Sequence, residues 1–382
     1  MSGPEAISLT RSLLRFDTVN PPGRERDCAR YAGSLLEEWG YEVHYHEYQD
    51  ARTSVIARAG GSDAGSDAGS EAKAPLCLTG HLDVVPLGTR AWSKDPFSGE
   101  ADGDRLYGRG SSDMKAGVAA ILLAARSMAK KLAGTPGIVI VLTAAEEGGC
   151  IGSRHLSEQK DLLGKAGALV VGEPTSNYPL VGHKGSVKFH ARFKGVSAHG
   201  SMPHLGVNAI YKAARALARL EAFDFGVRSH PVMGKPTLNV GTIAGGSSVN
   251  AVADSADIGI DIRTVPGMDH ALLMNHLKDI LEEADLEVFS NLGPVWTEPE
   301  QAWVQRVFEI CKPFVDDRLE ASTAPYMTDA ANLLKVYGGA PTVVLGPGEA
   351  AMAHQTDEYC SMERIRQAVS IYETLIRDWT GA

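Results

Sequence analysis

Leu76-Cys77-Leu78-Thr79-Gly80-His81-Leu82-Asp83 is a short apolar run that ends in a histidine and, two residues later, an aspartate. Such a run predicts a buried β-strand, and the side chains of residues i and i+2 project from the same face of a strand. In an open α/β sheet, ligands bind at the carboxyl ends of the strands. His81 and Asp83 are therefore candidates for a metal ligand and its hydrogen-bonding partner. A capping Asp beside a solvated His explains the pair equally well at this point.

Three further apolar runs along the chain end in residues of the same kind. Residues 137–143 lead to Glu146 and Glu147, residues 168–172 to Glu173, and residues 341–345 to the loop that carries His354. Asp113 stands at the start of a helix expected over residues 114–131, where an Asp also serves as an N-cap. Each residue alone has an ordinary explanation, but together they place two imidazoles and several carboxylates at one edge of one parallel sheet. This pattern predicts a metal site.

The composition is that of an ordinary globular protein, with 44% hydrophobic and 22% charged residues in a chain of 382, a length that favours two domains. A net charge of −10 without any basic cluster argues against nucleic acid and anionic membranes as partners. No apolar run is long enough to span a bilayer, and residues 1–15 lack the pattern of a secretory signal. The five cysteines are scattered and without CxxC spacing, which is typical of reduced thiols in a cytoplasmic protein.

The expected elements divide the chain into an α/β domain and an insert. Residues 1–181 and 293–382 are expected to form a mostly parallel sheet flanked by helices, with helices near 4–17, 27–39, 300–314, 329–336 and 362–379. Residues 41–48 and 54–59 are expected to be strands of a meander, and the polar tract 60–73 an exposed hairpin loop. Residues 182–292 read as an inserted α+β domain, with strands at 187–195, 237–243, 249–263 and 286–290 and helices at 207–223 and 269–284.

The expected ligand set favours two metal ions. Sites of His, Asp and Glu suit Zn, Mn or Co better than soft metals, and five ligands exceed what one tetrahedral ion uses. One carboxylate would then bridge the pair, and a carboxylate that is not a ligand must take the proton of the attacking water. The doublet Glu146-Glu147 offers one ligand and one base. A purely structural zinc site is disfavoured because such sites prefer closed, cysteine-rich shells.

Five motifs resemble those of the dinuclear zinc amidohydrolases and peptidases of the M20 type. They are GHLDVVP, LYGRGSSDMKAG, TAAEEGG, VGEPT and GPG…AHQTDEY, which follow one another in the family's order over nearly the whole chain. The resemblance implies a zinc-peptidase-like catalytic domain, an inserted lid and dimerisation domain, two divalent metal ions, most often zinc, and a homodimer.

The resemblance also implies a role for each candidate residue of the catalytic domain. His81 and Glu173 would bind one metal, Glu147 and His354 would bind the other, and Asp113 would bridge them. Asp83 would orient His81, and Glu146 would be the general base.

Three residues of the insert match further family positions. His199 matches a histidine that reaches the active site of a partner subunit and steadies the oxyanion. Asn250 and Arg263 match residues that hold the carboxylate of the substrate, which a bidentate Arg contact recognises by its geometry. Without the resemblance, a surface His, a turn Asn and an ion pair on a sheet face would be the ordinary interpretations.

The motifs look most like those of the acetylornithine deacetylases, so the function expected is hydrolysis of the amide bond of a small N-acyl amino acid. A metallocarboxypeptidase or dipeptidase, or a succinyl-diaminopimelate desuccinylase-like enzyme, is the alternative within the family. Met327-Thr328-Asp329-Ala330-Ala331 is closer to the TDAA of glutamate carboxypeptidases than to the TEAP of the deacetylases. A non-catalytic relative is the alternative from another class, but it would have no need of Glu146 beside intact ligands.

Overall fold

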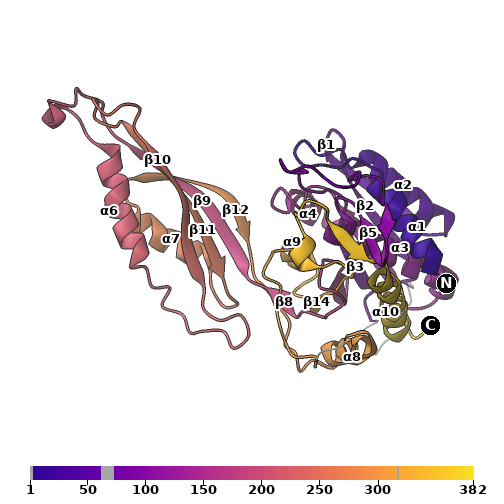
Figure 1. Ribbon diagram of the computed structural model, residues 1–382. Helices are drawn as coiled ribbons and strands as arrows, with labels where there is room; N and C mark the ends of the chain where they lie inside the picture. Colours follow the sequence, from indigo (N-terminus) through magenta and orange to yellow (C-terminus); the bar gives the residue numbers. More distant parts are fainter. Residues whose placement is uncertain (1–2, 62–72, 316–317) are drawn as a thin grey trace. The chain divides into compact units, whose positions relative to one another are not determined.

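The computed structural model describes residues 3–61, 73–315 and 318–382, and the chain divides into two compact units (Figure 1). One unit comprises the residues up to Gly182 and those from Trp296, and the other comprises His183–Val295. The boundaries expected from the sequence fall after residues 181 and 292. The expected hairpin loop at 60–73 lies almost entirely outside the described residues. No helix in the described part of the chain is both long and apolar enough to cross a bilayer.

The first unit is built on a six-stranded sheet with the strand order β1-β2-β6-β3-β7-β14. The strands are β1 (Glu42–Gln49), β2 (Arg52–Ala59), β3 (Leu76–His81), β6 (Ile138–Thr143), β7 (Ala168–Val171) and β14 (Thr342–Val344). β6, β3, β7 and β14 are parallel neighbours, whereas β1 and β2 add an antiparallel edge. The mixed α/β fold with a mainly parallel sheet is confirmed. The hairpin expected between β2 and β3 was wrong, because β6 lies between these two strands and pairs with both.

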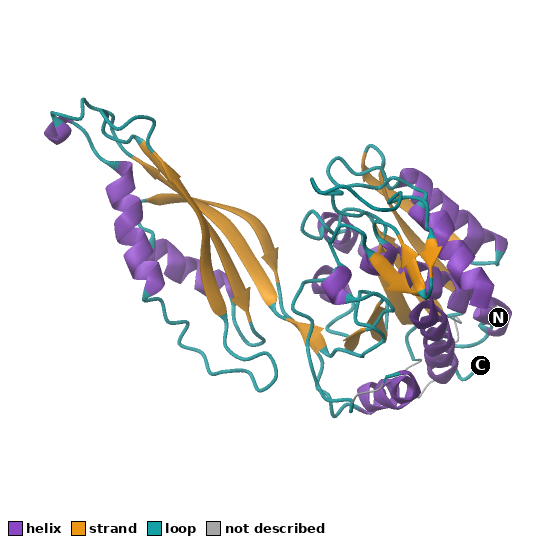
Figure 2. Ribbon diagram, in the orientation of Figure 1, coloured by secondary structure: helices purple, strands orange, loops and turns teal. Residues whose placement is uncertain are grey.

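Helices cover both faces of this sheet (Figures 1 and 2). One side carries α1 (Gly3–Leu14), α2 (Arg26–Glu38), α3 (Ala116–Met128) and α10 (Met362–Thr380), and the other carries α4 (Ile151–Ser157) and α9 (Ala330–Val336). Along β3, Leu76 and Leu78 belong to the core shared with α3, while Cys77 faces the other way toward Tyr337. Burial of both faces explains why the central strands are continuous apolar runs. The described residues of this unit also form the α-helices α5 (Lys160–Leu163) and α8 (Ala302–Cys311).

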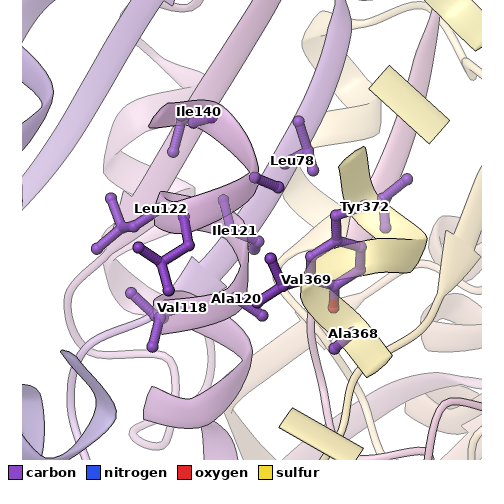
Figure 3. Close-up of a cluster of buried hydrophobic side chains, with 14 of the residues drawn as sticks. Leu78, Val118, Ala120, Ile121, Leu122, Ile140, Ala368, Val369 and Tyr372 are labelled. Carbon is purple, nitrogen blue, oxygen red and sulfur yellow. The ribbon is translucent and has the colours of Figure 1, made fainter. Parts of the chain in front are cut away.

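Helix α3 lies in the middle of the core, between the sheet and α10 (Figure 3). Its sequence, AGVAAILLAARSM, is apolar on almost every side, as expected of a helix buried all round. Ile121 and Leu122 lie near Leu78 and Ile140 of the sheet, and Tyr372 of α10 donates a hydrogen bond to the carbonyl of Leu345. The segment that precedes α3 is thus anchored on a fully packed helix.

The second unit is an antiparallel sheet with the order β10-β11-β9-β12. Its strands are β9 (Gly185–Lys194), β10 (Thr237–Gly245), β11 (Ser255–Thr264) and β12 (Ala284–Leu292), and its helices are α6 (Ala209–Glu221) and α7 (His270–Ile280). Burial alternates along β11, because one face packs on the two helices. The strand expected over 249–263 begins only at Ser255. The preceding residues form a turn in which Ala251 pairs with His199.

Candidate metal centre

The carboxyl ends of the four parallel strands meet at one edge of the sheet, and the residues predicted from the strand ends follow them there. His81 is the last residue of β3, Glu146 and Glu147 follow β6, Glu173 follows β7, and His354 lies on the loop after β14. Strands that run in parallel necessarily end on the same side, so short loops after each are enough to bring these side chains together.

Asp113 lies between the two histidines. Its Oδ1 is 3.0 Å from Nε2 of His81, and its Oδ2 is 3.5 Å from Nε2 of His354. Asp113 was expected to open a helix, but α3 starts three residues later, and the backbone angles of Asp113 (φ −122°, ψ 91°) are not helical. It therefore does not cap α3, and its carboxylate presents one oxygen to each imidazole.

Each histidine also lies near a second carboxylate. Oε2 of Glu173 is 3.7 Å from Nε2 of His81, and Oε2 of Glu147 is 3.1 Å from Nε2 of His354. Donor atoms of His81, Asp113 and Glu147 lie within 4.8 Å of one another, and so do those of His81, Glu146 and Glu173. The arrangement thus offers two adjoining sets of nitrogen and oxygen donors, with Asp113 between the two histidines.

The ionisation of this cluster is strongly perturbed. Burial, reinforced by the charges of Asp113 and Glu147, raises the pKa of Glu173 to about 8, and burial beside Glu173 raises the pKa of Glu146 well above its usual range. Hydrogen bonds with Asp113 and Glu147 raise the pKa of His354 to about 10. Burial alone would raise the pKa of Asp113. The hydrogen bonds from His354 and His81 outweigh this effect and leave the pKa of Asp113 well below its usual range.

These groups fit a pair of divalent cations. Four carboxylates crowd around two imidazoles, and buried like charges are costly unless a cation compensates them. Oε1 of Glu147 is buried and has no hydrogen-bond partner within the described part of the chain, so it is free to act as a ligand. The other ring nitrogen of His81, Nδ1, lies 2.9 Å from the carbonyl oxygen of Asp83, which is the contact that orients a metal-binding imidazole.

The carboxylate of Asp83 is hydrogen-bonded to the backbone of Glu146 and Glu147. Its Oδ1 accepts the backbone N–H of Glu146 at 2.9 Å, and its Oδ2 accepts the N–H of Glu147 at 3.1 Å and the side-chain amide of Asn20 at 2.8 Å. The same carboxylate is 3.6 Å from Nδ1 of His81, farther than the carbonyl of Asp83 itself. In this structure the carboxylate of Asp83 therefore holds the doublet, while its backbone carbonyl meets the imidazole.

The residues predicted in the second unit do not gather at one place. His199 and Asn250 are exposed and lie on neighbouring loops, joined by a hydrogen bond from the Gly200 N–H to the Asn250 carbonyl. Arg263 lies near the far end of β11, where it pairs with Asp261 at 3.0 Å. Ser255 and Arg263 are about 27 Å apart along an extended strand. One copy of this unit therefore cannot bring His199 and Arg263 to the same small substrate.

Residues 77–378 match the model of Peptidase family M20/M25/M40. The chain belongs to this family. Curated relatives include acetylornithine deacetylases of two Vibrio species. The protein of Vibrio campbellii is 32% identical over 96% of this chain and 95% of its own, and that of Vibrio parahaemolyticus is 31% identical over the same shares. The family resemblance expected from the five motifs is confirmed, and the chain is an enzyme of the M20 hydrolase family.

Solved structures of M20 proteins share the fold. A metallo-carboxypeptidase of this family from Sulfolobus solfataricus superposes with a TM-score of 0.80 over 99% of both chains at 18% identity. A Bacillus subtilis protein described as a dinuclear metal binding peptidase of the M20 family gives a TM-score of 0.71 at 16% identity, over 99% of this chain and 98% of that one. Such low identity establishes the architecture of an M20 protein and leaves the substrate to be argued from the site.

Several polar residues around the M20 site were not singled out from the sequence. Cys150 donates to Oε1 of Glu146 at 3.2 Å, and Asp329 belongs to the same group of donor atoms. Arg109 and Glu358 form a buried ion pair directly behind Asp113. These last two stand inside the quoted motifs LYGRGSSDMKAG and AHQTDEY, so the motif match was the one signal that pointed to them.

Proposed function

We propose that this M20 enzyme is a dimetal hydrolase that cleaves the amide bond of a small N-acyl amino acid, as the name of its acetylornithine deacetylase relatives suggests. The observation that carries the proposal is the position of Asp113, with one carboxylate oxygen toward each histidine and a second carboxylate beside each of them. His81 and Glu173 would hold one ion, Glu147 and His354 the other, and Asp113 would bridge them.

Glu146 is the proposed general base. Two divalent ions would polarise the substrate carbonyl and lower the pKa of the attacking water when bound. Glu146 adjoins the donor groups without being needed as a ligand, so it would accept the proton of the water and return it to the leaving amine. Asp83 would fix the position of this carboxylate, because it accepts the backbone N–H groups of Glu146 and Glu147.

Zinc is the proposed metal, with cobalt or manganese as substitutes. Imidazole and carboxylate ligands suit all three ions, and no thiol belongs to the two donor sets that contain His81 in the described part of the chain. Free, buried thiols at all five cysteines support a reducing compartment, which we propose to be the cytoplasm.

A peptidase is the second candidate within the same chemistry. Structural relatives include a tripeptidase from Staphylococcus aureus and the Sulfolobus carboxypeptidase, and hydrolysis of a peptide bond needs the same water and base. Both substrate classes present a carboxylate, for which Arg263 of one copy and Asn250 of another are the proposed partners, because Asn250 lies beside His199 at the opposite end of the sheet. A small change in pocket contacts shifts discrimination by about 1–3 kcal/mol, so relatives with different substrates share one centre.

A substrate panel tests the proposal directly. The protein loaded with Zn or Co is assayed with N-acetyl, N-succinyl and N-formyl amino acids, with N-acetylornithine among them, and with dipeptides. We expect the highest kcat/KM for an N-acetyl amino acid. Faster hydrolysis of dipeptides would favour the peptidase, and no turnover by metal-loaded protein anywhere in the panel would contradict the proposal.

We infer a homodimer from the second unit. His199 and Arg263 stand at opposite ends of one sheet, so a substrate meets both only if one of them comes from another copy. The end near His199 carries exposed apolar side chains on the loop before α6, on α6 and on the edge strand β10, namely Val196, Met202, Leu205, Ile210, Tyr211 and Ile243. An exposed edge strand with apolar neighbours is suited to pairing with a second chain.

The dimer is tested in solution. Ile243→Arg puts a charge on the exposed edge of β10 and should shift the protein from dimer to monomer in sedimentation. Deletion of residues near 184–291 should also leave a monomer, which lacks activity. A dimer that survives both changes would contradict this use of the second unit.

A further inference from the structure

An ion pair that contributes no ligand lies directly behind the proposed centre. Arg109 and Glu358 are buried, with exposed fractions of 1% and 0%. Nη1 of Arg109 donates a hydrogen bond to Oε2 of Glu358 at 2.6 Å. The two residues are far apart in sequence. Arg109 precedes Asp113 by four residues, and Glu358 follows His354 by the same interval.

Glu358 holds the backbone of the segment that carries Asp113. Its Oε1 accepts the N–H groups of Ser112 at 2.8 Å and Asp113 at 3.0 Å, and its Oε2 accepts the N–H of Gly110 at 3.0 Å. With Arg109, four donors converge on one buried carboxylate, so both of its oxygens are fully used. The peptide N–H of Asp113 itself is therefore fixed by a residue from the loop of His354.

Arg109 reaches the segments that follow the two histidines. Nη1 donates to the carbonyl of Gln355, next to His354, and Nη2 donates to the carbonyl of Pro86, each at 3.1 Å. Pro86 ends the GHLDVVP stretch that begins at the carboxyl end of β3. The planar guanidinium thus joins the His81 segment, the Asp113 segment and the His354 segment through one side chain, which a lysine could not do.

Backbone contacts also hold the Asp113 segment against the His354 loop. β5 (Arg105–Tyr107) pairs with β15 (Tyr359–Ser361) and with β4 (Ala101–Asp102), and the Gly108 N–H donates to the Glu358 carbonyl at 2.9 Å. A Cβ at Gly348 would lie 2.0 Å from the carbonyl oxygen of Ser112, so the His354 loop passes against the Asp113 segment with no room for a side chain. The ion pair between Arg109 and Glu358 therefore lies where the Asp113 segment and the His354 loop pack closely against each other.

We propose that Arg109 and Glu358 are positioning residues that fix Asp113 between His81 and His354 and thereby set the affinity of both ion sites. The inference rests on the proposed dimetal function. A buried ion pair is by itself weak evidence of any role beyond packing. What distinguishes this pair is where its hydrogen bonds end, since they end on the peptide groups of the proposed bridging ligand and of the residues next to it.

Glu25 and Arg52 provide a matched comparison in the same unit. They form a bidentate, buried ion pair, with hydrogen bonds of 2.8 and 2.9 Å. Their further side-chain hydrogen bonds are with the carbonyl of Pro22 and, at 3.3 Å, with the N–H of Ala145, the residue before Glu146. None is with the segment 109–113 in the described chain. Loss of Glu25 should cost stability in the same way while leaving the bridge between the histidines in place.

The experiment compares Glu358→Gln with Glu25→Gln in the full-length protein. Metal-free protein is titrated with Co(II), and uptake is followed by equilibrium dialysis and by the visible absorption of bound cobalt. The amide that replaces the Glu358 carboxylate would present an NH2 group to backbone donors, so we expect Co(II) affinity to fall about 10–100-fold and the absorption bands to shift. Glu25→Gln should bind two Co(II) ions with the wild-type spectrum, even where its melting temperature falls as far as that of Glu358→Gln.

Arg109→Lys gives a second test that keeps the three backbone contacts of Glu358, and it decides the matter should Glu358→Gln fail to fold. We expect weaker Co(II) binding and a shifted spectrum there too. Wild-type affinity and spectrum in both variants, or an equal loss of affinity in Glu25→Gln, would overturn the positioning role and leave the dimetal function standing. Wild-type protein that takes up no Co(II) would overturn both.

Discussion

The two units place their polar residues by different rules. In the first unit, the candidate residues follow the ends of parallel strands, except Asp113, which precedes α3. Each of the two histidines lies 3.0–3.7 Å from two carboxylates. In the second, the strands are antiparallel and successive loops lie at opposite ends, so His199 and Arg263 are far apart. A parallel sheet can concentrate a site within one chain, whereas one copy of this antiparallel unit leaves its predicted residues at opposite ends of the sheet.

The two units also treat charge differently. The first buries several carboxylates next to one another, which shifts their pKa values strongly and calls for a cation. The second carries its charge on exposed ion pairs such as Lys194 with Asp285, which contribute little to stability. We therefore expect reaction chemistry and metal dependence to reside in the first unit, and substrate recognition and assembly in the second.

The largest expected effect is on the proposed base. Glu146→Gln keeps the size of the side chain but cannot accept a proton, so kcat should fall by about 10²–10⁴-fold. Metal content, measured on the same sample, should stay at two ions per chain. Glu147→Gln is the matched control, because it should lose metal as well as activity. A Glu146→Gln protein that loses its metal would show that Glu146 is a ligand.

The strand-end pattern was sufficient to predict most of the first unit. Runs of apolar residues mark strands buried on both faces, and parallel neighbours must end together. These two rules alone assign the strand-end residues to one edge of the sheet, namely His81, Glu146, Glu147, Glu173 and His354. Asp113 lies beside them, although α3 begins three residues after it, so Asp113 neither opens nor caps that helix. Helices and strands of the second unit were also predicted within a few residues, apart from the start of β11.

Contacts between distant segments could not be predicted. Asp83 accepts hydrogen bonds from the backbone N–H groups of Glu146 and Glu147, which are 63 and 64 positions away in the sequence. Glu358 accepts one from the N–H of Asp113, which is 245 positions away. No periodicity records such a pairing, because it depends on how loops meet after the sheet has formed. The position of β6 between β2 and β3 was missed for the same reason.

The next largest effect concerns the division of labour between units. His199→Ala should lower kcat by about 10²–10³-fold, as loss of a group that stabilises an oxyanion does. If the histidine acts in a neighbouring copy, mixing His199→Ala with Glu146→Ala chains should restore about a quarter of wild-type activity, because half of the dimers are mixed and each has one intact site. The assay is refolding or co-expression of the two inactive variants, with each variant alone as control. Absence of recovery in verified mixed dimers would contradict action across subunits.

Removal of metal should affect one unit and spare the other. Ions at about a thousand times their dissociation constant stabilise the folded state by about 4 kcal/mol, and all of the proposed ligands lie in the first unit. After chelation, hydrogen exchange followed by mass spectrometry should speed up in β3, β6, β7 and the His354 loop. Exchange in β9 and β11 serves as the internal control and should stay unchanged. Equal acceleration in both units would show that the metals stabilise the whole chain and not the first unit alone.

The smallest effect is the pH dependence of the metal-free protein. The pKa of His354 rises from 6.5 to about 10 on folding, so its contribution to stability is complete below pH 6.5 and is lost as the pH rises through 10. The pKa of Glu173 rises from 4.5 to about 8, so the folded state holds this proton longer, and stability falls as the pH rises from 4.5 to 8. Both groups act in the same direction, and the urea midpoint of chelated protein should be lower at about pH 9 than at about pH 6.

With metal bound, the urea midpoint should instead rise with pH over the lower part of this pH range, because ions and protons compete for the same donor atoms. His354→Gln provides the matched control. It removes one of the two titrating groups, so the fall in the urea midpoint of the metal-free variant should become shallower between pH 6.5 and about 10. A metal-free protein that is more stable at high pH than at low pH would mean that the carboxylates around Asp113 share their charge with a cationic group that is not in this cluster. The contrast between a first unit that buries unbalanced charge and a second unit that exposes paired charge would then be wrong.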